Sequence, residues 1–164
     1  MFQKDTYVFY GSGGICLVSD ICVAPLEGMP TDRTYYVLRS LYDKSGVMYV
    51  PTDSDSVFLR PLLTESEASA LLEEISALSP IEWTDAKHLR LSYAETMGLH
   101  DPRAWVRVIK TVRLRASAEN GRGKRLSETE RGYAESARRY LVSELALALG
   151  CTEQEAEERA FARL

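Results

Sequence analysis

The stretch that decides the fold runs from residue 126 to residue 150 and reads LSETERGYAESARRYLVSELALALG. It opens with a capping box, in which the Ser127 hydroxyl accepts a backbone amide and Glu130 reaches back to the start of the helix. Gly150 suits a helix end, so the sequence predicts one long helix. Gly132 lies inside it at a cost of about 1 kcal/mol relative to alanine, so we expect a neighbour packed closely against it. The main apolar stripe consists of Ala134, Ala137, Leu141, Leu145 and Ala148.

Helical patterns also precede and follow this stretch. Thr64-Glu65-Ser66-Glu67 is another capping box, and a second helix is expected from about residue 85 to residue 97. Asp101-Pro102 is an N-cap followed by proline, which predicts a third helix. Residues 152–164 form a short last helix in this interpretation.

The helix that begins at Pro102 separates two faces. At about 100° per residue, Trp105 shares an apolar side with Val108, Ile109 and Val112. We therefore expect Trp105 to be buried and the basic residues on the opposite side to project into solvent. None of these basic residues has an acidic neighbour at i+4, so we expect them to be unpaired. They are Arg103, Arg107 and Lys110.

The first third of the chain is typical of short strands separated by tight turns. Gly11-Ser12-Gly13-Gly14 is interpreted as a hairpin turn and not as a phosphate loop, because a strand-like run follows it instead of a helix. The pattern predicts a small barrel or a strongly bent sheet. We expect an α+β chain, with a β domain over residues 1–62 and an α-helical bundle over residues 63–164. The strand-like runs are residues 7–10, 15–23, 35–38, 47–50 and 57–60.

Positive charge is concentrated in residues 103–139, which carry eleven basic and four acidic side chains, whereas the whole chain has a net charge of −4. A cationic segment in an acidic protein indicates a docking face for a polyanion. The bland alternative is a solvated helix surface with internal ion pairs. A second basic cluster lies near the start of the long helix and is interpreted as further phosphate contacts. It consists of Arg122, Lys124, Arg125 and Arg131.

Nothing in the sequence indicates catalysis. It has no nucleophile–base pair and no metal-ligand spacing, and we expect no cofactor and no enzymatic activity. Cys16, Cys22 and Cys151 are interpreted as reduced, mostly buried thiols of a cytoplasmic protein. No apolar run is long enough to span a membrane, and we expect a monomer.

The ordered set of these patterns resembles the CarD/CdnL family of bacterial transcription regulators over roughly residues 5–150. The segment from Leu126 through Glu144 to Ala146 resembles the long helix of that family, and Tyr10 to Gly14, Tyr36 to Leu38, Val50-Pro51 and Leu59-Arg60 resemble its N-terminal module. The resemblance implies a Tudor-like or SH3-like barrel that binds the RNA polymerase β subunit. It also implies a helical domain that contacts promoter DNA at the upstream edge of the bubble and stabilises the open complex, so that the protein associates with the nucleoid through polymerase.

Candidate site residues follow from the resemblance together with the charge pattern. For DNA they are Trp83, Lys87, Arg103, Arg107, Lys110, Arg122, Lys124, Arg125, Arg131 and Arg138. For RNA polymerase they are Tyr35, Val37, Arg39, Val47, Tyr49, Val50 and Pro51, on strands that include an edge able to extend a partner sheet. The sequence departs from the family at Tyr49 and Ala24, which replace arginines of some members, and at Gly11, where proline is frequent.

Two alternatives stay open at this point. Trp83 matches the family tryptophan that wedges into the opened minor groove, but a tryptophan between two helices also packs as core. The basic helical face would serve equally to bind an acidic protein, which would make the chain a protein–protein adaptor instead of a DNA-contacting regulator.

Overall fold

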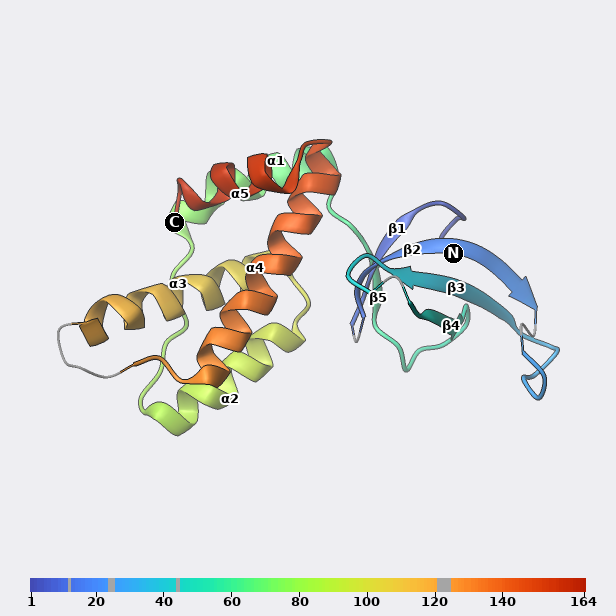
Figure 1. Cartoon of the computed structure of the whole chain (residues 1–164), viewed down its shortest axis with the longest axis horizontal. Helices are drawn as coiled ribbons and strands as arrows, with labels where there is room; N and C mark the ends of the chain where they lie inside the picture. The colour runs from blue at the N-terminus through green and yellow to red at the C-terminus, as the bar shows by residue number, and fades with distance from the viewer. Residues whose placement is uncertain (12, 24–25, 44, 121–124) are drawn as a thin grey trace. The chain divides into compact units, whose positions relative to one another are not determined.

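The structure, a computed structural model, describes residues 1–11, 13–23, 26–43, 45–120 and 125–164. The chain divides into two compact units, Met1–Leu62 and Leu63–Leu164 (Figure 1). An antiparallel sheet forms the first unit and helices form the second, so the fold class is α+β, as expected from the sequence.

The first unit contains five antiparallel strands: β1 Tyr7–Tyr10, β2 Gly14–Val23, β3 Thr34–Ser40, β4 Val47–Pro51 and β5 Leu59–Pro61. Their order is β4-β3-β2-β1-β5, which is consistent with a Tudor-like β domain. Tyr10 pairs with Gly14, so a strand follows the glycines and the hairpin interpretation is confirmed. A Cβ atom at Gly13 would lie 2.8 Å from Cδ1 of Tyr10, which explains the need for glycine there.

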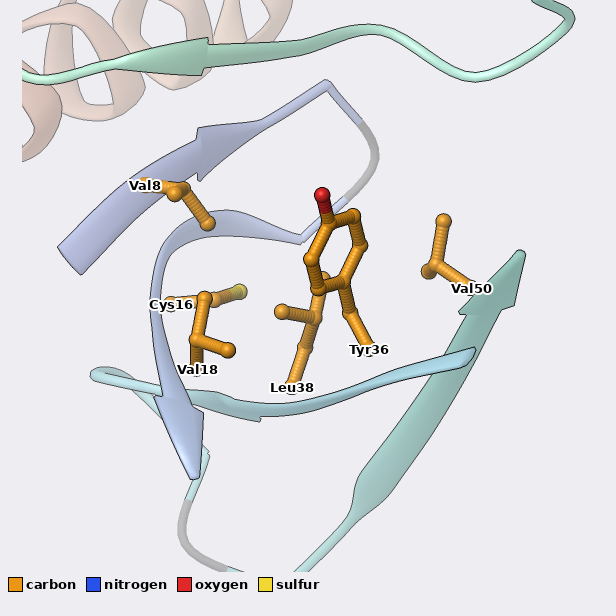
Figure 2. Close-up of a cluster of buried hydrophobic side chains, with 6 residues drawn as sticks. All are labelled: Val8, Cys16, Val18, Tyr36, Leu38 and Val50. Carbon is orange, nitrogen blue, oxygen red and sulfur yellow. The ribbon is translucent and has the colours of Figure 1, made fainter. Parts of the chain in front are cut away.

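One apolar cluster in the core of the β unit receives side chains from β1, β2, β3 and β4 (Figure 2). The register of β2 shifts between Val18 and Asp20, and such a bulge increases the local bend of a strand. Phe2 packs edge-on against the Tyr36 ring, and its amide donates to the Tyr36 hydroxyl at 2.9 Å. The chain ahead of β1 is thereby tied to the sheet. The cluster consists of Val8, Cys16, Val18, Tyr36, Leu38 and Val50.

The second unit contains α1 Glu65–Glu74, the 3₁₀ turn η1 Ile75–Ala77, α2 Ala86–Gly98, α3 Pro102–Asn120, α4 Glu128–Leu149 and α5 Glu153–Phe161. Both predicted capping boxes are present, at Thr64 for α1 and at Ser127 for α4. A third capping box, in which Thr152 pairs with Glu155, starts α5 and was missed in the sequence.

α4 supplies the main apolar stripe of the helical core. Ala137, Leu141 and Leu145 are fully buried, and Gly150 ends the helix with a left-handed φ of 62°. Trp105 of α3 is fully buried, as expected, and its ring centroid lies 5.5 Å from that of Tyr140 on α4. The α3–α4 pair is thus the centre of the unit, and it holds the other helices in place.

The side chain of an acidic residue, Glu144, lies inside this core. The Glu144 side chain is fully buried on α4, and its Oε1 accepts the backbone amide of Leu63 at 2.9 Å. Leu63 immediately precedes the N-cap of α1, so the carboxylate fixes the point where the chain enters the helical unit.

The cysteines are less uniformly buried than expected. Cys16 is buried, and burial raises the pKa of its thiol to about 11, whereas Cys22 and Cys151 are only half-buried. Of the helices in the described part of the chain, none has the length and apolar character that crossing a membrane requires.

The expectation of close packing at Gly132 is wrong. The residue is exposed on α4, and a Cβ atom built there would meet nothing within 4 Å. No neighbour therefore requires the glycine, and its conformational cost to the helix is not offset by any contact with the described residues.

Gly132→Ala is accordingly expected to raise the free energy of unfolding by about 0.5–1 kcal/mol, because alanine restricts the unfolded chain without meeting a neighbour. Urea denaturation monitored by circular dichroism measures the change. Gly150→Ala is the contrasting variant. Its φ of 62° disfavours a Cβ atom, so it should lower stability by about 1 kcal/mol. Equal effects of the two substitutions would contradict this account.

Candidate nucleic-acid interface

The basic row on α3 does not project freely into solvent. Arg103 donates from Nε and Nη2 to the two carboxylate oxygens of Glu74, at 2.7 and 3.1 Å. The hydrogen bond from Arg103 is the main cause that lowers the pKa of Glu74. The expectation that Arg103 is unpaired is therefore wrong, because its partner comes from α1 and lies far from it in sequence.

The next two cations of the row bind backbone carbonyls. Arg107 donates from Nε to the Ser79 carbonyl at 3.2 Å, and Lys110 donates from Nζ to the carbonyls of Ser76 and Leu78 at 3.1 and 2.8 Å. These carbonyls lie in and just after η1, where helix geometry leaves acceptors unsatisfied. Burial lowers the pKa of Lys110. Carbonyls do not neutralise charge, so Arg107 and Lys110 remain cationic while they hold this segment against α3.

Arg138 of α4 is also engaged. It forms an ion pair with Glu157 of α5, and its guanidinium carbon lies 5.6 Å from the centroid of the Phe161 ring. Arg113 approaches the same ring at 5.1 Å. Cation–π contacts and an ion pair thus tie α5 to α3 and α4, although the Arg138 side chain keeps 57% of its exposure.

Four other exposed cations lie on α2 and around the start of α4. None of them forms an ion pair with any residue that the structure describes. We call this set the basic corner; it consists of Lys87, Arg90, Arg125 and Arg131. Arg90 was missed in the sequence, although its position one turn after Lys87 on a helix would have indicated it. Arg122 and Lys124 lie outside the described residues.

Two residues of the basic corner, Arg90 and Arg125, line a cavity of about 330 Å³. Arg90 from α2, Arg115 from α3 and Arg125, which precedes α4, all line it. Arg115 donates from Nε to Glu130 Oε1 at 2.5 Å, while Glu130 Oε2 accepts the amide and the hydroxyl of Ser127 at 2.9 and 2.8 Å. Burial opposes ionisation of Glu130, but these hydrogen bonds prevail and its pKa is lowered.

Trp83 lies between η1 and α2 and is half-buried. Its flanks are well fixed: the buried Ile81 donates its amide to Thr111 Oγ1 on α3 at 2.8 Å, and the Asp85 carboxylate caps α2 by accepting the His88 amide at 2.9 Å. The fully buried tryptophan of this unit is Trp105. Trp83 is therefore held at the edge of the helical core with part of its side chain open to solvent.

The residues expected to meet polymerase lie on β3 and on its neighbour β4, which ends the strand order. The registered pairs are Arg39 with Val47, Val37 with Tyr49 and Tyr35 with Pro51, and they lie on a different face from the core residues of β3. Tyr35 and Val50 are each only 3% exposed, so their side chains are not available to a partner. We call the remaining set the β3–β4 strip; it consists of Val37, Arg39, Val47, Tyr49 and Pro51.

No group of His, Cys, Asp and Glu side chains in the described part of the chain has an arrangement that would hold a metal ion. What the described helical unit offers instead is exposed guanidinium and ammonium groups on α2 and around the start of α4, and a half-buried tryptophan in the segment that precedes α2. Such groups bind phosphates through charge and bidentate hydrogen bonds.

Comparison with known families agrees with this description. Residues 92–160 match the family described as CarD, C-terminal domain, and the match runs from within α2 to within α5. None of the curated proteins searched matches the chain. The matched helices follow an antiparallel five-stranded sheet consistent with a Tudor-like domain, and together they support a CarD/CdnL-like, transcription-related protein.

Proposed function

We propose that the chain is a non-enzymatic transcription regulator that links RNA polymerase to promoter DNA. The β unit binds the polymerase β subunit. The helical unit contacts DNA at the upstream edge of the transcription bubble, largely independently of sequence, and stabilises the open complex.

The observation that carries the DNA half of the proposal is the basic corner. Its four cations on α2 and around the start of α4 are exposed, and none of them forms an ion pair with a described residue. Duplex phosphates would neutralise these charges and release counterions. Contacts of this kind position a protein on DNA without reading bases.

The other basic residues have secondary roles in this proposal. Arg103, Arg107, Lys110 and Arg138 hold neighbouring segments, yet Arg107 and Lys110 keep an unneutralised charge and add to the positive field around the helical unit. Arg122 and Lys124 are candidates for phosphate contact from their charge and sequence position alone.

The β unit supplies the polymerase half of the proposal. β4 ends the strand order, so a strand of the partner can pair with it while side chains of the β3–β4 strip provide specificity. Tethering to polymerase raises the effective concentration of the basic corner at the promoter, so a weak intrinsic DNA affinity is sufficient. Stabilising the open complex by about 1.4 kcal/mol would shift its equilibrium roughly tenfold.

The double substitution Lys87→Glu with Arg131→Glu is expected to weaken DNA binding at least tenfold and to reduce the steepness of its salt dependence. In a plot of log K against log salt, the slope should become shallower by about 0.9 for each phosphate that the variant no longer neutralises. Fluorescence anisotropy with a labelled promoter duplex measures both quantities. These positions are preferable to Arg107 and Lys110, whose replacement would also release carbonyls near η1.

The matched control is Arg159→Glu, which makes the same charge reversal on the exposed surface of α5. It should leave the salt slope near the wild-type value. An unchanged slope in the double variant would contradict the proposal. Loss of polymerase pull-down with intact DNA binding would instead favour the adaptor function.

Trp83→Ala is expected to shorten the lifetime of the open complex while polymerase binding persists, because the wedge acts only on opened DNA. The lifetime is measured on open complexes that are prevented from escaping the promoter. Pull-down measures polymerase binding. Trp83→Phe retains an apolar ring and should recover part of the lifetime. Loss of about 3–5 kcal/mol of unfolding free energy in Trp83→Ala would identify the side chain as core and remove the wedge.

Tyr49→Lys, on the β3–β4 strip, is expected to reduce pull-down of the polymerase β subunit and to leave the DNA salt slope unchanged. Tyr7→Lys is the control, because Tyr7 is a partly exposed tyrosine on β1, away from β4. Equal loss of pull-down in the two variants would show that the strip has no special role.

A further inference from the structure

The cavity in the basic corner concentrates three arginines from three separate segments of the helical unit. Arg90 comes from α2, Arg115 from α3, and Arg125 from the chain just before α4. Side chains of like charge normally spread apart over a surface, because convergence raises their electrostatic energy. Convergence on one cavity of about 330 Å³ therefore suggests an anionic occupant.

The acidic side chain at this cavity is already committed. One carboxylate oxygen of Glu130 accepts a hydrogen bond from Arg115, and the other accepts the amide and the hydroxyl of Ser127. Among the described lining residues, three guanidinium groups thus face one carboxylate, which leaves an excess of two positive charges. The excess lies with Arg90 and Arg125, which are exposed and form no ion pair with another described residue.

One of the arginines is positioned in advance. The side chain of Arg115 is only 23% exposed and that of Glu130 only 11%, so their ion pair is shielded from solvent and holds the guanidinium in place. Arg90 and Arg125, which also line the cavity, are exposed. A donor held in place beside two adjustable donors lowers the ordering cost of binding a small anion.

The size and lining of the cavity restrict the ligand. Its volume is at the lower end of the range for small-molecule sites, so it accommodates a phosphate or a diphosphate more readily than a large cofactor. Guanidinium groups bind phosphate oxygens in bidentate fashion, and Thr129 adds a hydroxyl at the edge. Ala86 and Leu89 supply an apolar wall, which reduces the local dielectric and strengthens these interactions.

We propose that this cavity is a phosphate-binding site in which Arg90, Arg115 and Arg125 hold a single phosphate or diphosphate group. The group comes either from the DNA backbone or from a free phosphorylated small molecule. The DNA source rests on the function proposed above, whereas the free source does not.

The test is a titration of the full-length chain with inorganic pyrophosphate at constant ionic strength, followed by isothermal calorimetry and by NMR shifts of the arginine Nε–H groups. Saturable binding is expected, with the largest shifts at Arg90, Arg115 and Arg125. Arg90→Ala and Arg125→Ala, both at exposed positions, should each weaken binding about tenfold, as expected for loss of one charge-assisted hydrogen-bonding partner.

Arg159→Ala is the control, because it removes the same charge from α5, away from the cavity lining. It should leave the dissociation constant within about twofold of wild type, since general screening alone is sequence-independent. Non-saturable binding, or equal losses in Arg159→Ala and Arg90→Ala, would overturn the site. Circular dichroism confirms that each variant is folded.

Competition separates the two sources of phosphate. If pyrophosphate displaces a labelled promoter duplex and Arg90→Ala weakens both ligands, the cavity holds a backbone phosphate. If duplex and pyrophosphate bind together, the cavity serves a free phosphorylated ligand. Pyrophosphate binding without DNA binding would retain the site and remove the proposed function, and DNA binding without pyrophosphate binding would do the reverse.

Discussion

The carboxylate of Glu130 is the interaction on which the organisation of the helical unit depends. It closes the capping box that starts α4, the longest helix, and it binds Arg115 of α3 across the helix pair. One side chain thus sets where α4 begins and how its first turn faces α3. Both oxygens of Glu130 are occupied, so among the described residues that line the cavity none forms an ion pair with Arg90 or Arg125.

Positive charge in this chain is divided between two tasks. On α3, Arg103 pairs with the Glu74 carboxylate, and Arg107 and Lys110 donate to carbonyls just after η1. These contacts hold the segment that leads to Trp83 against α3. On α2 and at the start of α4, Lys87, Arg90, Arg125 and Arg131 form no ion pair with any residue that the structure describes. A basic stretch read as one surface in the sequence therefore separates, in three dimensions, into a structural part and a part available to anions.

Features that depend on residues close together in the sequence could be predicted, whereas ion pairs between residues far apart in the sequence could not. The capping boxes at Thr64 and Ser127 and the burial of Trp105 follow from spacings within a few residues, and all were confirmed. The partner of Arg103 is Glu74 on another helix, and spacing rules within one helix cannot predict such a pair. For the same reason the candidate site was predictable as an excess of charge but not as a cavity, whose walls come from three segments. The prediction of close packing at Gly132 was wrong because the sequence alone does not distinguish an exposed glycine from a packed one.

The buried Glu144 recognises the main chain and not a side chain at residue 63, since its partner is the Leu63 amide. An anchor of this kind is indifferent to residue identity, with proline as the one exclusion because it has no amide hydrogen. Sequence drift at the junction is therefore compatible with an unchanged attachment point, provided that the carboxylate on α4 is retained. The residue that fixes the start of the helical unit, Glu144, therefore lies far along the sequence from Leu63.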